Sequence, residues 1–166
     1  KTTGAASQGI YASRSLITLS NANIATTGSP VMYLWGYESE GSIGINAFYL
    51  STVTGNANVQ TSGAKAIAVN ATAMSTVDLV DSTLTTKGTA AHGVVASDAM
   101  ASLTRGNIKT SGSGAHGIFS SGSGSGANPL GRGEISLPSA TEVTATDVTI
   151  ATSGIASHGI VAGAAP

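Results

Sequence analysis

The chain has 166 residues, of which 9% are charged, and its formal net charge is −1. So small a charge offers no electrostatic basis for binding nucleic acid or an anionic membrane surface. The sequence has no cysteine, which excludes disulfides, thiolate zinc sites and a thiol nucleophile.

A short phrase recurs along the chain: an aliphatic residue, a spacer, a threonine, a second spacer and a glycine. Its tail opens the sequence as Thr2-Thr3-Gly4. In chain order the complete copies are Ile24–Gly28, Val59–Gly63, Leu84–Gly88, Ile108–Gly112 and Ile150–Gly154. Counted from Gly4, the glycines follow one another at intervals of 24, 35, 25, 24 and 42 residues. Such a recurrence is typical of proteins whose repeats stack on one another.

A second phrase begins about four residues after each glycine. It reads Gln8-Gly9-Ile10, Lys65-Ala66-Ile67, His92-Gly93-Val94, His116-Gly117-Ile118 and His158-Gly159-Ile160. An alternating apolar stretch follows, and then a turn-prone or polar residue at Asn21, Asn56, Asp81, Arg105 and Asp147. Each unit of about 24 residues therefore predicts three short strands separated by turns.

Three strands per unit without a helix predict an all-β fold, a parallel β-helix with three sheets running along it. Equivalent residues should form inward-facing columns. The aliphatic columns are Ile24, Val59, Leu84, Ile108, Ile150 and Ile10, Ile67, Val94, Ile118, Ile160. A buried column of Thr26, Thr61, Thr86, Thr110 and Thr152 should bond its hydroxyls along the axis, to one another or to carbonyls. The repeated glycines should lie at a bend that excludes a Cβ atom.

The two long intervals indicate loop insertions near 29–50 and 119–142 in one β-helix that covers residues 1–166. The first insertion contains Tyr33, Trp35 and Tyr37, whose rings could contact a sugar or protein partner or fold over the wall as a flap. The second insertion is rich in Ser and Gly and could contain part of another coil. Because both termini fall inside a repeat, we expect the chain to be a piece of a longer solenoid.

The run Thr110-Ser111-Gly112-Ser113-Gly114-Ala115-His116-Gly117-Ile118 resembles the passenger domains of bacterial autotransporters of the pertactin type. The resemblance extends over nearly the whole chain except the two insertions. It implies a right-handed parallel β-helix that is secreted across the outer membrane to the cell surface and serves adhesion, often in virulence. A membrane barrel, which the family has, would lie beyond Pro166. The implied partner is a host-surface protein or glycan, or a second copy of the chain.

His92, His116 and His158 would share one column, where neutral imidazoles could bind a transition metal. Local hydrogen bonding is the favoured interpretation, because Gln8 and Lys65 are placed in the same column. The carboxylates considered for catalysis are Asp78, Asp81, Asp98, Glu134, Glu142 and Asp147. They are scattered along the chain, whereas glycoside hydrolysis needs a close pair. We therefore expect a non-catalytic surface segment without a cofactor. The alternatives are a self-associating extracellular filament unit and the non-catalytic part of a carbohydrate-active enzyme.

Overall fold

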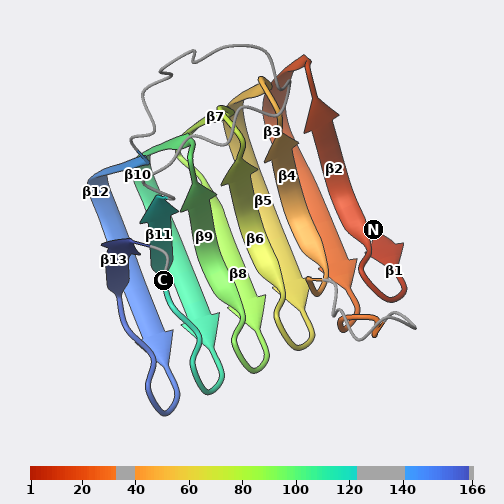
Figure 1. The fold of residues 1–166 in the computed structure, drawn as a ribbon, viewed down its shortest axis with the longest axis vertical. Helices are drawn as coiled ribbons and strands as arrows, with labels where there is room; N and C mark the ends of the chain where they lie inside the picture. Colours follow the sequence, from red (N-terminus) through yellow and green to blue (C-terminus); the bar gives the residue numbers. More distant parts are fainter. Residues whose placement is uncertain (33–39, 123–140, 165–166) are drawn as a thin grey trace.

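A computed structural model describes residues 1–32, 40–122 and 141–164, and its ribbon is a stack of strands (Figure 1). One sheet contains β1 (Thr2–Thr3), β3 (Leu16–Thr27), β5 (Thr52–Ser62), β7 (Thr76–Val80), β8 (Thr83–Lys87), β10 (Met100–Ser111) and β12 (Glu142–Ser153). The other contains β2 (Gln8–Ser13), β4 (Ile43–Phe48), β6 (Ile67–Thr72), β9 (His92–Ser97), β11 (Ile118–Gly122) and β13 (Ile160–Ala164).

All strand pairs in both sheets are parallel, and the described residues contain no helix. The predicted all-β fold with parallel sheets is therefore confirmed. No helix able to cross a membrane occurs among the described ranges.

The three expected sheets are found as two, because one sheet bends in the middle of its long strands. Asn21 in β3 and Arg105 in β10 have φ values of 48° and 50°, and Asp81 lies between β7 and β8 with φ 50°. These are three of the turn positions predicted from the sequence. In β5 the bend falls on Gly55, at φ 120°, next to the predicted Asn56. Strands β3, β5, β10 and β12 each run through the bend, so two of the predicted strands become one.

The inner column of the second sheet corrects one predicted alignment. Val69 pairs with Val94, whereas Ile67 pairs with His92. Val69 lies six residues after Gly63, just as Val94 lies six residues after Gly88. The sequence analysis placed Ile67 in the column of Val94, because Lys65-Ala66-Ile67 resembles the other copies of the second phrase in residue type. Because the error was two residues, Ile67 is still buried.

Strand β4 lies within the range 29–50 that was expected to be a loop. Its Ile45 pairs with Ile10 on one side and Val69 on the other, so Gly44-Ile45 is an overlooked copy of the second phrase. The extra residues of this repeat therefore lie before β4. Strand β11 likewise extends to Gly122, inside the expected loop 119–142. Strands β10 and β12 are direct neighbours although the long second interval separates Ile108 from its partner Ile150, so no coil lies between them.

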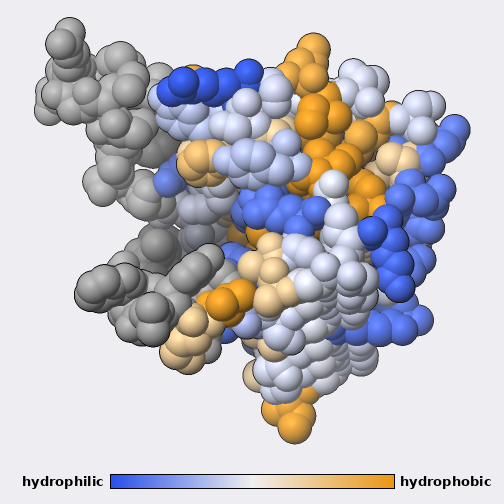
Figure 2. All heavy atoms as spheres, turned by 90° about the vertical axis from the view of Figure 1, so that its right-hand side faces the viewer, coloured by the Kyte–Doolittle hydropathy of each residue, from blue (hydrophilic) through white to orange (hydrophobic). Residues whose placement is uncertain are grey.

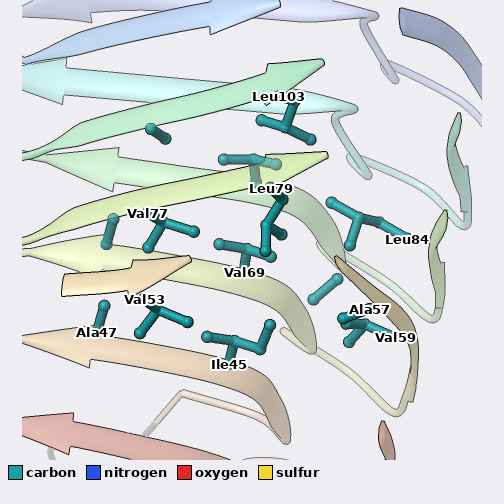
Figure 3. Packing of buried hydrophobic residues seen from close by; sticks show 14 of the residues in the cluster. Ile45, Ala47, Val53, Ala57, Val59, Val69, Val77, Leu79, Leu84 and Leu103 are labelled. Carbon is teal, nitrogen blue, oxygen red and sulfur yellow. The ribbon is translucent and has the colours of Figure 1, made fainter. Parts of the chain in front are cut away.

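The hydrophobic core is enclosed by the second sheet and by both halves of the bent first sheet (Figure 3). Along strands such as β7 and β10, buried residues alternate with outward-facing ones. Val59, Leu84 and Ile108 are buried as predicted, and Ile24 is buried near the first coil. At the last coil, Ile150 is only partly buried and Ile160 is 61% exposed. The prediction of burial is wrong for these two residues, because within the described chain no further coil covers β12 and β13. It is also wrong for Ile10, which is only partly buried in the edge strand β2 at the other end.

The threonine column is buried as predicted at Thr26, Thr61, Thr86 and Thr110, but its hydroxyls do not bond along the axis. Thr86 Oγ1 donates to the carbonyl of Ala91 at 3.4 Å, in the turn of its own coil. Thr110 Oγ1 donates to Ala115 in the same way. The hydroxyls of Thr26 and Thr61 have no hydrogen-bond partner.

We expect Thr61→Val to raise the free energy of unfolding by about 1 kcal/mol, because it removes a buried hydroxyl without a partner and keeps the shape. Thr86→Val should be close to neutral, since it loses one long hydrogen bond. Alanine at either position should destabilise the fold by opening a small cavity. Urea unfolding of the four variants measures these differences. A Thr61→Val variant less stable than the parent would show that its hydroxyl is satisfied.

Candidate functional site

The aromatic residues predicted to bind a partner, Tyr33, Trp35 and Tyr37, lie outside the described residues. Their role stays a prediction. The three histidines of the predicted column lie within the described chain and are brought together.

His92, His116 and His158 form a ladder of stacked rings where strands β9, β11 and β13 of the second sheet begin. The ring centroids of His92 and His116 are 5.1 Å apart at an interplanar angle of 10°. Those of His116 and His158 are 5.3 Å apart at 16°. Phe119 stacks beside the first two, 5.6 Å from His92. The neighbouring residues in this column are Ile67 and Ile43, so the predicted place of Lys65 in it is wrong.

Hydrogen bonds between successive rungs leave no common metal position in this ladder. The backbone N–H of His116 donates to Nδ1 of His92 at 3.2 Å, and that of His158 donates to Nδ1 of His116 at 3.2 Å. An accepting Nδ1 carries no proton, so the neutral ring is protonated at Nε2. The lone pairs of stacked rings run nearly parallel and do not converge. No group of three or more metal-ligating side chains occurs within the described ranges. The geometry favours local hydrogen bonding.

Burial, and after it the charge that the neighbouring His116 can carry, lower the pKa of His92 to about 4. The pKa of His116 is also below its usual range, first by burial and then by the charge that His158 can carry. Both shifts disfavour the imidazolium form. His92 is therefore neutral at physiological pH.

We expect stability to fall as the pH falls from about 6.5 towards 4. In this window the unfolded chain takes up a proton at His92 and the folded chain does not, so the full contribution is present only above 6.5. Because the ring is partly hydrated, the loss should be about 1–2 kcal/mol. Urea unfolding at both pH values, with His92→Gln as the control, measures it. Equal losses in parent and control would contradict the assignment.

An exposed ion pair, between Arg105 and Asp81, lies at the bend of the first sheet. Arg105 donates to Asp81 from Nε at 2.9 Å and from a terminal nitrogen at 3.1 Å. The hydrogen bond from Arg105 holds the pKa of Asp81 below its usual value. Glu134, another carboxylate considered for catalysis, lies outside the described residues.

The bent half of the first sheet has an outward-facing surface, which we call the polar wall. The sequence analysis did not predict it. Its residues alternate with the buried aliphatic and threonine columns. They are Asn23, Ala25, Thr27, Asn58, Gln60, Ser62, Thr83, Thr85, Lys87, Asn107, Lys109, Ser111, Thr149, Ala151 and Ser153. The set contains amides, hydroxyls and ammonium groups, and neither a carboxylate nor a large apolar side chain. The spacer positions of the recurring phrase encode most of it.

Two hollows open along the polar wall. One of about 230 Å³ lies at the bend, where Asn21, Asn23, Asn56 and Asn58 line it together with Asp81 and Thr83. The amide of Asn58 donates to Oδ1 of Asn23 at 3.4 Å, and the backbone N–H of Asn21 donates to Oδ1 of Asn56. The other hollow, of about 550 Å³, is lined by two lysines, an amide, an alanine and five hydroxyl residues. They are Lys1, Lys87, Gln60, Ala25, Thr26, Thr27, Thr61, Ser62 and Thr85.

The described residues form an all-β fold of parallel sheets with a polar, carboxylate-free wall. In comparisons with known proteins, no family model, no curated protein and no solved structure matches this chain.

Proposed function

We propose that the chain is a right-handed parallel β-helix whose three-strand coils each take up one sequence repeat. The coil length is supported by the register of the central strands. Val69 pairs with Val94, and Val94 pairs with Ile118, so each partner lies one repeat further along the chain. The right hand rests on the resemblance to autotransporter passenger domains. A crystal structure tests it, and a left-handed coil would remove that resemblance.

The proposed function is adhesion or another surface interaction, by a non-catalytic segment at the bacterial cell surface or outside the cell. The observation that carries it is the polar wall, an in-register surface that runs over five adjacent strand stretches and contains two hollows. Hydrogen-bonding groups repeat along it at the spacing of the strands. Such a surface suits an extended partner, a host glycan or protein, better than a small substrate.

Adhesion of chain-coated beads tests this function. Beads that carry the purified chain should bind cultured epithelial cells above the level of albumin-coated beads. Binding should fall when the cells are first treated with glycosidases or proteases, which tells a glycan partner from a protein. Binding no better than that of albumin beads would contradict the proposal.

Self-association is a second candidate function, favoured by apolar side chains that are exposed at the ends of the described stack of strands. Ile155 and Ile160 are 82% and 61% exposed at the last coil. Figure 2 faces the opposite end, beside β2 and β3, and shows hydrophobic residues between hydrophilic ones there. A second copy could continue the parallel register from one end to the other. Sedimentation velocity over a range of concentrations tests this, with Ile160→Asn as the weakened variant, and a monomer throughout would remove it.

A further inference from the structure

We propose that the polar wall binds a linear acidic polysaccharide, one that carries carboxylate or sulfate groups. This inference rests on the proposed adhesive function and names the partner's chemistry and the surface it occupies. Three observations carry it: the sign of the charges on the wall, the spacing of its polar groups, and the two hollows that interrupt it.

The wall concentrates positive charge in a chain whose net charge is −1. Lys87 and Lys109 project from it, and Lys1 lines the larger hollow beside Lys87. The eight acidic residues of the chain are all absent from the wall. Asp81, which lines the smaller hollow, forms an ion pair with Arg105. Neither Lys87 nor Lys109 forms an ion pair within the residues that the structure describes. Both ammonium groups are therefore available to an anionic ligand.

The arrangement of these groups suits a chain of sugars. Lys109 pairs with Thr85, and Lys87 pairs with Ser111, so the two lysines lie diagonally on adjacent strands. Sheet geometry places their Cα atoms about 8 Å apart. The amides of Asn58 and Gln60 and the hydroxyls of neighbouring strands continue the same surface. Amide and hydroxyl groups both donate and accept, as sugar hydroxyls do. The hollows at Asn58 and at Lys87 can receive groups that project from the sugar chain.

Other macromolecules fit the polar wall less well. Protein interfaces draw most of their energy from buried aromatic and Arg anchors, and the wall has neither. Single-stranded nucleic acid binds by stacking its bases on aromatic rings, which the wall also lacks. The two lysines suit the acidic groups of a polysaccharide, and the surrounding hydroxyls and amides suit the hydroxyl groups of its sugars.

Titration calorimetry of the full chain tests the proposal with heparin as the sulfated probe and polygalacturonate as the carboxylated probe. Neutral dextran and single-stranded DNA are the comparison ligands. The double variant Lys87→Gln, Lys109→Gln removes the charges of the wall. Arg14→Gln removes one exposed cation elsewhere, at the turn between β2 and β3, where Arg14 lies 4.7 Å over the ring of Tyr49. Circular dichroism checks that each variant folds.

We expect heparin or polygalacturonate to bind, with affinity that falls as salt is added. The double variant should bind about five- to tenfold more weakly, and Arg14→Gln should bind within about twofold of the parent. The proposal is overturned if neither probe binds, if the double variant binds like the parent, or if Arg14→Gln weakens binding equally. DNA or neutral dextran that binds as tightly as the acidic probes overturns it too.

The bead assay separates this inference from the proposed function. Cell adhesion that persists in the double variant, without any polysaccharide binding by the parent, overturns the inference and leaves the adhesive function standing. Polysaccharide binding that depends on Lys87 and Lys109 supports the inference, and beads that then fail to adhere overturn the adhesive function alone.

Discussion

Gly88→Ala should destabilise the chain by about 3–5 kcal/mol, a large effect for the addition of a single methyl group. A Cβ atom at Gly88 would lie 2.1 Å from the carbonyl oxygen of Gly63 and 2.6 Å from its carbonyl carbon. Both atoms belong to the backbone of the adjacent coil, so no side-chain rotation relieves the overlap. The φ value of Gly88, 137°, adds strain for any residue with a side chain. Urea unfolding measures the loss.

Two other glycines separate the sources of this cost. Gly4 has nearly the same φ, 131°, but nothing lies within 4 Å of its Cβ position. Gly114 is likewise unobstructed, at φ 67°. Alanine at Gly4 reports backbone strain alone, and Gly114→Ala should cost about 1 kcal/mol. If Gly88→Ala were no worse than these two variants, close coil stacking would not be the reason for glycine in this column.

Leu84→Ala should reduce the free energy of unfolding by about 2–5 kcal/mol, because it opens a cavity in the aliphatic column. Leu84 is fully buried between Val59 and Ile108, its partners in β5 and β10. The matched control is Leu16→Ala, since Leu16 is 73% exposed and its truncation removes the same atoms from the surface. Thermal and urea unfolding of both variants give the comparison. Similar losses in the two variants would show that the aliphatic column is not the core.

The recurring phrase predicts the fold well where residue type and spacing agree. Its aliphatic and threonine positions place Leu84 and Thr86 inside, and its glycine marks the stacked bend at Gly88. The predictions fail where the two signals diverge. Matching by residue type selected Ile67, whereas the constant distance from the glycine selects Val69. Counting from the glycine fails at Gly44-Ile45, because extra residues precede this copy, and only the local Gly-Ile match identifies it.

The surface was harder to predict than the core. Spacers such as Lys87 and Lys109 are as periodic as the buried columns, so the polar wall was within reach of the sequence. Its hollows were not, because they depend on how side chains of three strands meet at the bend and beside it. The direct pairing of β10 with β12 could not be predicted from the sequence either, since no pattern in residues 112–154 indicates whether an extra coil is present.

The polar wall continues in register from β10 to β12, across the long interval that separates these strands in the sequence. Because the chain has no cysteine, paired cysteine substitutions test it directly. Lys109 and Ala151 are register partners, so their Cα atoms should be about 4.8 Å apart, within disulfide reach. The control pair, Lys109 with Ser153, is offset by two residues, about 8 Å, and is too distant.

After oxidation, non-reducing mass spectrometry should find a disulfide in the Lys109→Cys, Ala151→Cys variant and none in the Lys109→Cys, Ser153→Cys variant. A coil inserted between β10 and β12 would separate the first pair by about 9.6 Å and prevent its disulfide. Absence of the first disulfide, or equal formation of both, would contradict the continuous wall.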